Sequence, residues 1–482
     1  MKQQGSIIPP HVLIFPGPGQ GHVNPMLKLA ELLGLSGLKV TFLNFQFIHD
    51  QLLLHADIEA RFTKYPGFQF KKIPDRMSVP RAERPEDMAD IIKDLIERMK
   101  TSSKTLKKIL VENSPPIDCI IADMLMGFVH DVAKEVGIPV IPFENASSCS
   151  FWTVLSIPRI IAAGELPIKG NQDMDRLITT VPGMETFLRC RDLPTCCRVN
   201  DLADPKLLMI TNETRESQAL ILKTFEDLEA PILCPLRTRY PKIYTIGPLH
   251  ELLKTKLRSI KKQESYSSLN PLWEVDRTCI TWLDNQASHS VLYVSFGSIA
   301  IMTREQLMEF WYGLENSKKK FLWVIRPYSV TTNDDGVEEI PEELQEGPKE
   351  RGYIVKWAPQ EEVLAHKAIG GFLAHSGWNS TLESIVAGVP MICWPCFGDQ
   401  QMNSRFVSEV WKLGMDMKDV CDRKVVEKMV NDLMVDRREE FVKSTARMAE
   451  LARKSVTEGG SSSCSLEHLI QDIKSMSIDR HS

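Results

Sequence analysis

Two polar residues in the first half of the chain could together form a general base. His22 follows a short apolar run, His11–Pro16, that is predicted to be a β-strand. Asp123 follows a second candidate strand, Ile117–Ala122. If both strands belong to one parallel sheet, a carboxylate can hold one imidazole nitrogen while the other accepts a proton from a substrate. Alternatively, His22 is a polar surface residue and Asp123 caps the following helix.

A glycine-rich turn joins the first strand to a helix expected at Pro25–Leu35. The turn, Gly17-Pro18-Gly19-Gln20-Gly21-His22, is followed by Asn24 as the expected helix cap, and it has features of a dinucleotide fingerprint. A nicotinamide or flavin site would need an acidic residue about 20 positions later, at the end of the second strand. Asn44 stands there instead. The sequence therefore disfavours an oxidoreductase.

The second half contains a dense polar and aromatic stretch, 357–400, that brings three candidate strand ends together. Trp357 ends one strand, and its indole ring could stack on a flat heterocycle. The run from His375 to Ser380 follows the strand Gly370–Ala374 and begins a helix. Free amides at a helix N-terminus, together with a nearby histidine, favour the binding of a diphosphate.

The same stretch offers partners for sugar hydroxyl groups. Glu383 either completes an S-x-x-E capping box with Ser380 or accepts hydrogen bonds from the diol of a ribose. Asp399 and Gln400 follow the strand Pro390–Trp394. A carboxylate and an amide at this strand end can hydrogen-bond the hydroxyls of a sugar.

These residues need a scaffold that places strand ends side by side. Apolar runs alternate with helical patterns in both halves, which predicts parallel strands buried on both faces. One long polar helix is expected around Glu86–Glu112. The alternation stops in a polar stretch, 249–275, and then restarts. We therefore expect an α/β fold with two doubly wound, Rossmann-like domains facing each other across a cleft. The expected boundaries are a first domain at 1–248, a linker at 249–275, a second domain at 276–460 and a C-terminal helix at 461–482 that packs back on the first domain.

The segment Trp357–Gln400 resembles the plant secondary-product glycosyltransferase signature, which marks UDP-sugar-dependent glycosyltransferases. The similarity extends over nearly the whole chain. It includes the first loop at 19–25, an interdomain motif at Arg191–Pro194, the end of the first domain at Gly247-Pro248, a phosphate loop at Phe296–Ser298 and the turn at 458–462. Ser376 departs from the pattern, because cysteine is common there. The resemblance implies the GT-B fold, in which the first half binds an acceptor and the second half binds the UDP-sugar.

The resemblance also implies a role for each matching residue. His22 matches the catalytic base and Asp123 its orienting partner, in a direct displacement with inversion. The implied donor contacts are Trp357 stacked on uracil, Ala358 and Gln360 on uracil and ribose, Glu383 on the ribose hydroxyls, Ser298, His375, Asn379 and Ser380 on the diphosphate, and Trp378, Asp399 and Gln400 on the sugar. Glutamine at position 400 resembles the pattern that prefers UDP-glucose.

Within the family, three tracts resemble plant iridoid and monoterpenoid glucosyltransferases, in particular enzymes that glucosylate 7-deoxyloganetic acid. They are 182–187, 198–201 and 309–314. We therefore expect glucose transfer to a hydroxyl or carboxyl group of a small lipophilic terpenoid or iridoid. Alternatively, the acceptor is a flavonoid, phenolic or cyanohydrin, or the chain is a non-catalytic nucleotide-sugar sensor. Loops at strand ends predict that Phe143, Glu144, Phe151, Trp152 and Met184 line the acceptor site.

Composition excludes other classes of function. The chain has 482 residues and a net charge of −5, so it lacks the concentrated basic surface of a nucleic-acid binder. No apolar run approaches the roughly 18 residues that a membrane helix needs, and the first apolar run is too short for a signal peptide. The eleven scattered cysteines predict free thiols in a cytoplasmic protein, and the pair Cys393 and Cys396 lacks further zinc ligands. We expect no metal, no cofactor beyond the donor substrate and no obligate protein partner.

Overall fold

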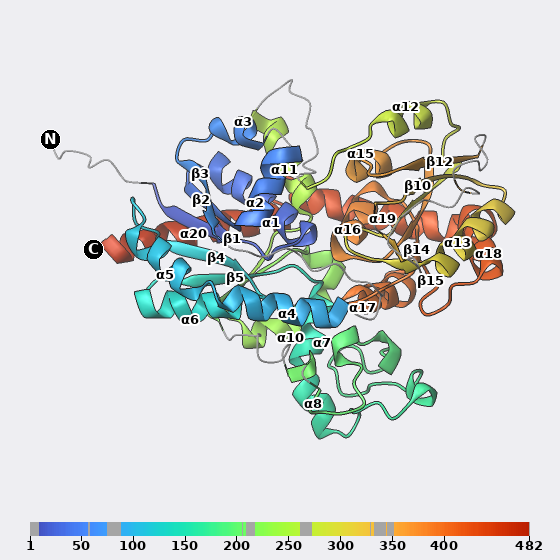
Figure 1. The fold of residues 1–482 in the computed structure, drawn as a ribbon, viewed down its shortest axis with the longest axis horizontal. Coiled ribbons are helices and arrows are strands. Elements are labelled where there is room, and N and C mark those ends of the chain that lie inside the picture. Colours follow the sequence, from blue (N-terminus) through green and yellow to red (C-terminus); the bar gives the residue numbers. More distant parts are fainter. Residues whose placement is uncertain are drawn as a thin grey trace.

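The computed structural model describes residues 9–55, 58–74, 88–204, 206–208, 217–260, 272–327, 329–331, 344 and 351–481. Within these ranges, two parallel β-sheets with helices packed against them form two α/β units that lie side by side (Figure 1). The prediction of two doubly wound domains is therefore confirmed.

The first sheet has the strand order β3-β2-β1-β4-β5-β6-β7, and its neighbouring strands are parallel. Its strands are β1 (His11–Phe15), β2 (Lys39–Phe45), β3 (Phe68–Ile73), β4 (Cys119–Asp123), β5 (Val140–Glu144), β6 (Ala219–Leu222) and β7 (Lys242–Thr245). The helices of this half are α1 (Gln20–Leu35), α2 (Gln46–His55), α3 (Ile58–Thr63), α4 (Met88–Lys100), α5 (Ser103–Glu112), α6 (Gly127–Val136), α7 (Ser148–Leu155), α8 (Ile157–Ala162), α10 (Glu226–Arg239) and α11 (Leu249–Ile260). Short 3-10 helices are η2 (Asn171–Asp173), η3 (Cys190–Asp192) and η4 (Thr195–Cys197).

The second sheet has the order β12-β10-β8-β13-β14-β15 and is also parallel. Its strands are β8 (Val291–Ser295), β10 (Lys320–Val324), β12 (Gly352–Val355), β13 (Ile369–Ala374), β14 (Met391–Cys393) and β15 (Gly414–Asp416), while β9 (Met302–Thr303) and β11 (Val330–Thr331) form a separate pair. The helices are α12 (Thr278–Asp284), α13 (Arg304–Asn316), α15 (Gln360–Leu364), α16 (Trp378–Ala387), α17 (Gln400–Arg405), α18 (Arg423–Asn431), α19 (Arg438–Val456) and α20 (Ser461–His481), with π-helical turns η5 (Phe406–Val410) and η6 (Asp432–Asp436).

In each sheet the strand order reverses at one point. The reversal lies between β1 and β4 in the first sheet, where Phe15 pairs with Ala122, and between β8 and β13 in the second, where Ser295 pairs with Ala374. Connections that leave such neighbouring strands run to opposite faces of the sheet and open a crevice at the carboxyl ends, where ligands bind. The residues that follow β1, β4, β8 and β13 are therefore brought to two crevices.

Two helix boundaries differ from the sequence prediction. Helix α1 begins at Gln20, with Gly19 as its N-cap, so Asn24 is not the cap and Pro25 lies inside the helix. The single long helix expected around 86–112 is two helices, α4 and α5, because the chain turns at Thr101, whose hydroxyl donates to Arg98 O at 2.6 Å. A hydroxyl that bonds to the preceding turn competes with the helical backbone.

The region predicted as an irregular linker, 249–275, begins with a regular helix. Leu249, Leu252 and Leu253 of α11 are buried, and the helix packs against α1. This spacing of leucines is the stripe of an amphipathic helix, which the surrounding lysines obscured in the sequence. Residues 261–271 lie outside the described residues. The predicted domain boundaries stay predictions.

The C-terminal helix α20 crosses back to the first sheet (Figure 1). There it lies against β7 and β4. Asp472 accepts hydrogen bonds from Lys242 Nζ at 2.9 Å and from the Tyr244 hydroxyl. Ser462 Oγ donates to the carbonyl of Gly247. The two units are therefore joined both by α11 and by the end of the chain. No helix in the described ranges is long and apolar enough to cross a membrane.

A buried carboxylate in α1 binds side chains of α3 and of the residues that follow α3. Glu31 is completely shielded from solvent and accepts hydrogen bonds from Arg61 Nη2 at 2.8 Å and from the Tyr65 hydroxyl at 2.7 Å. Lys64 Nζ lies 3.7 Å from the same carboxylate. A buried anion stabilises the fold only while it keeps its hydrogen-bonded cationic partners, because an unpaired buried charge is strongly destabilising.

Glu31→Gln should lower the free energy of unfolding by about 1–3 kcal/mol, because the partly buried guanidinium of Arg61 loses its counter-charge. Denaturant titration followed by circular dichroism measures this change. Glu97→Gln is the control, since Glu97 forms an exposed ion pair with Lys100 and its loss should cost below about 1 kcal/mol. Equal losses in the two variants would contradict the role assigned to Glu31.

Candidate active site

The structure brings His22 and Asp123 together at the crevice of the first sheet. His22 lies in the first turn of α1, and Asp123 is the last residue of β4. His22 Nδ1 and Asp123 Oδ2 are 2.7 Å apart. The Asp123 side chain is 1% exposed and that of His22 is 30% exposed, so the imidazole covers the carboxylate and itself faces outward.

The hydrogen bond sets the protonation of the pair. The charge of His22 and hydrogen bonds from it and from two backbone N–H groups outweigh the burial of Asp123, and the pKa of this carboxyl lies below its usual value. An ionised carboxylate only accepts, so His22 Nδ1 carries the proton and Nε2 is left as a basic nitrogen. Burial would lower the pKa of His22, but the charge and hydrogen bond of Asp123 raise it above its usual value.

Asp123 is held in place by three further donors. Its Oδ2 accepts from Gly17 N–H at 3.2 Å and from Asn145 Nδ2 at 2.7 Å, and its Oδ1 accepts from Leu125 N–H at 3.0 Å. The alternative role, a cap for the next helix, is wrong because the N-cap of α6 is Met126. Asp123 therefore orients His22 and not the helix.

A cavity of about 370 Å³ lies between the two units and is lined by residues from both. Every residue that the sequence analysis named for the donor lines it: Ser298, Trp357, Ala358, Gln360, His375, Trp378, Asn379, Ser380, Glu383, Asp399 and Gln400. His22 lines the opposite side. Their contacts with a UDP-sugar stay predictions, but the structure does bring them together.

The N-terminus of α16 opens onto this cavity. Its N-cap is Gly377, so Ser380 is the third residue of the helix and cannot form the capping box with Glu383. Instead, Gln360 Nε2 donates to Ser380 Oγ at 2.9 Å and to Glu383 Oε2 at 2.7 Å. Burial raises the pKa of Glu383 to about 7. Gln360 thus holds one oxygen of this carboxyl group, Oε2, and Glu383 lines the cavity, where a diol could meet it.

The loop after β8 comes close to the loop after β13. Gly297 has φ of +76°, and a side chain there would lie 2.4 Å from His375 Nε2, so only glycine fits between the strand end and the imidazole. Arg326 holds the loop through a hydrogen bond to Gly297 O at 2.7 Å. Burial and the charge of Arg326 lower the pKa of His375 to about 4. His375 is therefore neutral at physiological pH and brings no positive charge to the cavity that it lines.

Gln400 is partly engaged by the protein itself. Its Oε1 accepts from the N–H groups of Cys396 at 2.8 Å and Phe397 at 3.1 Å, which leaves its amide nitrogen as the group that can serve a ligand. Cys393 and Cys396 are free thiols, and burial raises the pKa of each to about 12. Asp399 accepts from Asn403 Nδ2 at 2.9 Å. The loop after β14 is thus held rigidly at the cavity.

The predicted acceptor residues divide into two groups. Glu144 and Phe151 line the cavity. Phe143 and Met184 are completely buried in the core, and Trp152 Nε1 donates to Pro182 O at 3.0 Å, so these three side chains do not line it, which corrects the prediction. Neighbouring residues of a strand or a helix point in different directions, and for each adjacent pair only one side chain reaches the cavity.

Sequence analysis missed two polar residues at strand ends. Asn145 follows β5 and Lys223 follows β6, and both line the cavity. Burial lowers the pKa of Lys223 to about 7. The rule that functional residues follow strands points to both, because each lies directly after a strand of the first sheet.

The donor helix α16 is hydrogen-bonded to the first unit. Asn379 Nδ2 donates to Gly21 O at 2.9 Å, and Trp378 Nε1 donates to Lys223 O at 2.8 Å. Gly21 O is available because Pro25, four residues later in α1, has no N–H to donate to it. Lys223 Nζ completes the contact by donating to Asn379 Oδ1. The amide of Asn379 therefore contacts the protein on both sides.

Comparison with known proteins identifies the family. The profile described as UDP-glucoronosyl and UDP-glucosyl transferase matches residues 270–444. A 7-deoxyloganetic acid glucosyl transferase from Catharanthus roseus is 53% identical, over 99% of this chain and 100% of the relative. The chain belongs to this transferase family. It is a UDP-glycosyltransferase, as the segment Trp357–Gln400 predicted.

Two further similarities agree with this assignment. A myricetin 3-O-rhamnoside 1,2-glucosyltransferase from Crocosmia x crocosmiiflora is 44% identical, over 97% of this chain and 96% of the relative. The crystal structure of Medicago truncatula UGT71G1 complexed with UDP-glucose has a TM-score of 0.76 and 26% identity, over 97% of this chain and 98% of that chain. The GT-B fold of the UDP-glycosyltransferase is thereby confirmed. Among the residues that the structure describes, no group of three or more His, Cys, Asp and Glu side chains could hold a metal ion.

Asp123→Asn should slow transfer to a hydroxyl acceptor by about a hundredfold or more, because an amide holds the ring but cannot stabilise its positive charge. The base acts in its neutral form, so activity falls as the pH decreases through the pKa of His22. Because Asp123 raises that pKa, the acidic limb of the kcat/KM profile should move to lower pH in the variant.

The matched control is Asp118→Asn. Asp118 is 3% exposed, directly precedes β4 and accepts from His11 N–H at 2.8 Å at the opposite edge of the sheet. The Asp118→Asn variant should leave the position of the acidic limb of the kcat/KM profile unchanged. Unchanged turnover and an unchanged pH profile in Asp123→Asn would show that the carboxylate has only a structural role.

Proposed function

We propose that this UDP-glycosyltransferase transfers glucose from UDP-glucose to a small plant iridoid acid of the 7-deoxyloganetic acid type, with inversion at the anomeric carbon. The observation that carries the proposal is that one cavity is lined both by His22, which is paired with Asp123, and by the loops after β8 and β13. The acceptor class is supported by the 53% identical relative, whose name states that acceptor.

Each step has a residue that can perform it. His22 Nε2 accepts the proton of the acceptor hydroxyl while that oxygen attacks the anomeric carbon, and Asp123 stabilises the imidazolium. A single displacement from the side opposite the leaving group inverts the configuration. UDP departs toward Ser298, the neutral His375 and the N-terminal amides of α16, whose dipoles meet the developing negative charge.

The acceptor side of the cavity suits a small lipophilic acid. Met124, Leu125, Phe151 and Val154 supply an apolar surface. Lys206 lies on the same wall and forms an ion pair with Asp90 at 3.2 Å, so a cation is present for a carboxylate. An apolar surface with few polar groups is typical of sites for such metabolites.

A second acceptor class is favoured by the 44% identical relative, whose name states a flavonol glycoside. Incubating the protein with UDP-glucose and either 7-deoxyloganetic acid or myricetin 3-O-rhamnoside, followed by mass spectrometry, decides between the two. A hexose adduct of the iridoid acid supports the proposal, and an adduct of the flavonol glycoside alone overturns it. UDP binding without any turnover would identify a nucleotide-sugar sensor.

The proposal includes no metal and no cofactor apart from the donor. The N–H and O–H groups around the diphosphate loops can serve the negative charge by themselves. Turnover measured before and after dialysis against EDTA tests this part of the proposal. A loss that Mg²⁺ restores would contradict it.

UDP-glucose should be preferred to UDP-galactose, because the amide nitrogen of Gln400 can donate to an equatorial hydroxyl while its oxygen is occupied. Competition between the two donors at equal concentration measures the preference. Gln400→Glu removes the donor group and should reduce the preference for glucose. A galactoside as the main product of the unmodified protein would overturn the assignment.

His22→Ala should distinguish a hydroxyl nucleophile from a carboxylate. A carboxyl group ionises near about pH 4 and needs no base at neutral pH. If the sugar is attached through a hydroxyl, the variant should lose about a hundred- to ten-thousandfold in kcat. If the sugar is attached through the carboxylate, the loss of kcat in the variant should be modest. The acidic limb of the pH profile should also be smaller with this acceptor than with an alcohol. Assays with one acid and one alcohol of similar shape make the comparison, and equal losses for both would refute the general-base mechanism.

A further inference from the structure

The segment 187–198 belongs to the first half of the sequence but is fastened to the second unit. Arg405 Nε at the end of α17 donates to Phe187 O at 3.0 Å. Gly398 N–H, in the loop before α17, donates to Thr195 Oγ1 at 3.0 Å. Both ends of the segment are therefore held by the loop and helix that carry Asp399 and Gln400.

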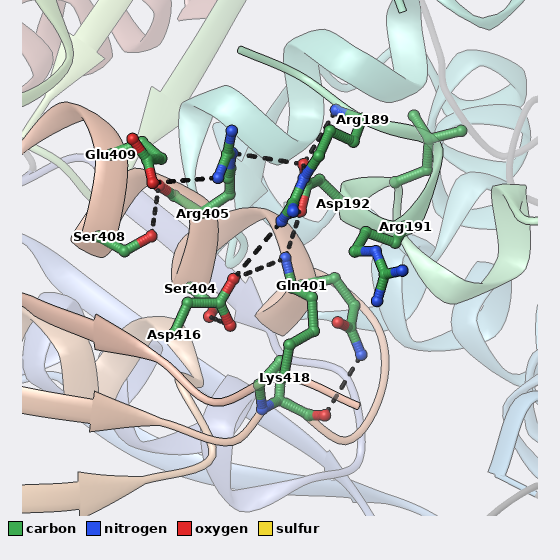
Figure 2. A network of polar contacts seen from close by, with 12 residues as sticks. Arg189, Arg191, Asp192, Gln401, Ser404, Arg405, Ser408, Glu409, Asp416 and Lys418 are labelled. Carbon is green, nitrogen blue, oxygen red and sulfur yellow. Dashed lines mark hydrogen bonds and ion pairs between the residues drawn. The ribbon is translucent and has the colours of Figure 1, made fainter. Parts of the chain in front are cut away.

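Asp192 lies at the centre of this interface (Figure 2). Its side chain is completely buried at the end of η3. Arg189, from the same segment, donates to it with Nε at 2.9 Å and Nη2 at 3.0 Å. The second unit supplies Lys418 Nζ as a direct hydrogen-bond donor and Arg405 Nε at 3.4 Å. One buried carboxylate thus joins cations from both units.

The cations around Asp192 share a second carboxylate. Asp416 Oδ2 lies 3.1 Å from Lys418 Nζ and 3.8 Å from Arg189 Nη2, and Ser404 Oγ donates to Asp416 Oδ1 at 2.7 Å. Burial opposes ionisation of Asp192, but the hydrogen bonds from Arg189 and the charge of Lys418 bring its pKa below the usual value. Asp192 is therefore an anion, and its removal would leave the buried Lys418 and the partly buried Arg189 with less negative charge beside them, although Asp416 would remain.

This interface adjoins the cavity. Pro194, Thr195 and Cys196 begin two residues after Asp192 and line the cavity, as do Gly398 and Asp399. The wall of the cavity formed by Pro194–Cys196 is thus hydrogen-bonded, through Thr195, to the loop predicted to hold the sugar. Helix α17 connects the two ends of the arrangement, since it begins at Gln400 and ends at Arg405.

We propose that Asp192 is a positioning residue that couples the two substrate sites. It fastens the wall Pro194–Cys196 to the loop that carries Asp399 and leads into α17 at Gln400, here called the sugar loop. Both therefore move with the second domain. The wall excludes water and fixes the acceptor only while the sugar loop is in place. Donor and acceptor are thereby aligned by one electrostatic contact that touches neither of them. This inference rests on the proposed glucosyl transfer.

The test is the fate of UDP-glucose in Asp192→Asn. A loosened wall misplaces the acceptor and admits water, which competes for the anomeric carbon and yields free glucose and UDP. We expect the ratio of hydrolysis to transfer to rise, and the KM of the acceptor to rise by on the order of tenfold. UDP affinity measured by calorimetry should stay unchanged, because Trp357, Glu383 and His375 lie away from this contact.

Thr195→Val keeps the test decisive if Asp192→Asn does not fold. It removes only the oxygen that accepts from Gly398 N–H and preserves the size of the side chain. It should shift the same hydrolysis-to-transfer ratio in the same direction. Asp192→Glu, which restores the charge, should recover part of the transfer activity.

Two control variants separate coupling from stability. Glu31→Gln removes a buried carboxylate of comparable environment within the first unit, and Asp419→Asn removes a 44% exposed partner of Arg191 at the same interface. Neither should change the ratio of hydrolysis to transfer. An unchanged ratio in both folded Asp192→Asn and Thr195→Val, with active unmodified protein, would overturn the inference. Failure of the unmodified protein to transfer glucose would instead overturn the proposed function.

Discussion

The hydrogen bond of 2.7 Å between His22 and Asp123 depends on the order of strands in the first sheet. The two residues are distant in sequence and meet because β1 and β4 are parallel neighbours at the point where that order reverses. A parallel sheet gathers its carboxyl ends at one edge, and the reversal opens space there for a side chain from α1. The same reversal between β8 and β13 brings Gly297 and His375 together in the second sheet. The two sides of the cavity, from the first and the second sheet, are thus two instances of one topological constraint.

The cavity handles charge mainly with dipoles and neutral groups. Burial lowers the pKa of Lys223 to about 7 and raises the pKa of Glu144 to about 7, while the pKa of His375 lies at about 4. These groups carry less net charge at neutral pH than their number suggests. In the proposed reaction a diphosphate would therefore be met mainly by backbone amides whose positions the fold has already fixed, which keeps reorganisation small when UDP departs.

Sequence patterns predicted the features that depend on strand ends and failed where side-chain direction decides. The apolar runs of β1 and β4 located His22 and Asp123, because strands buried on both faces have an unmistakable composition. Strand β15 was not predicted, because its three residues, Gly-Met-Asp, include only one large apolar side chain and so form no apolar run. Trp152 was expected at the acceptor site, yet its place beside Phe151 on a helix turns it toward Pro182. The contact between Asp192 and Lys418 joins residues far apart in the chain: the motif at Arg191–Pro194 indicated an interdomain segment, but local sequence does not identify Lys418 as its partner.

The proline in α1 has a consequence for recombining domains from related enzymes. By lacking one N–H group, Pro25 leaves the carbonyl of Gly21 free, and Asn379 of the other domain donates to it. The hydrogen-bond acceptor in one domain is thus free because its helix lacks an N–H group at Pro25, and the matching amide of Asn379 lies more than 350 residues later in the chain. A chimera that joins halves of two family members inherits a working interface only when both parents supply their side of this pair. Any crossover between positions 25 and 379 takes the two sides of this contact from different parents, so the parents must carry compatible residues at both positions.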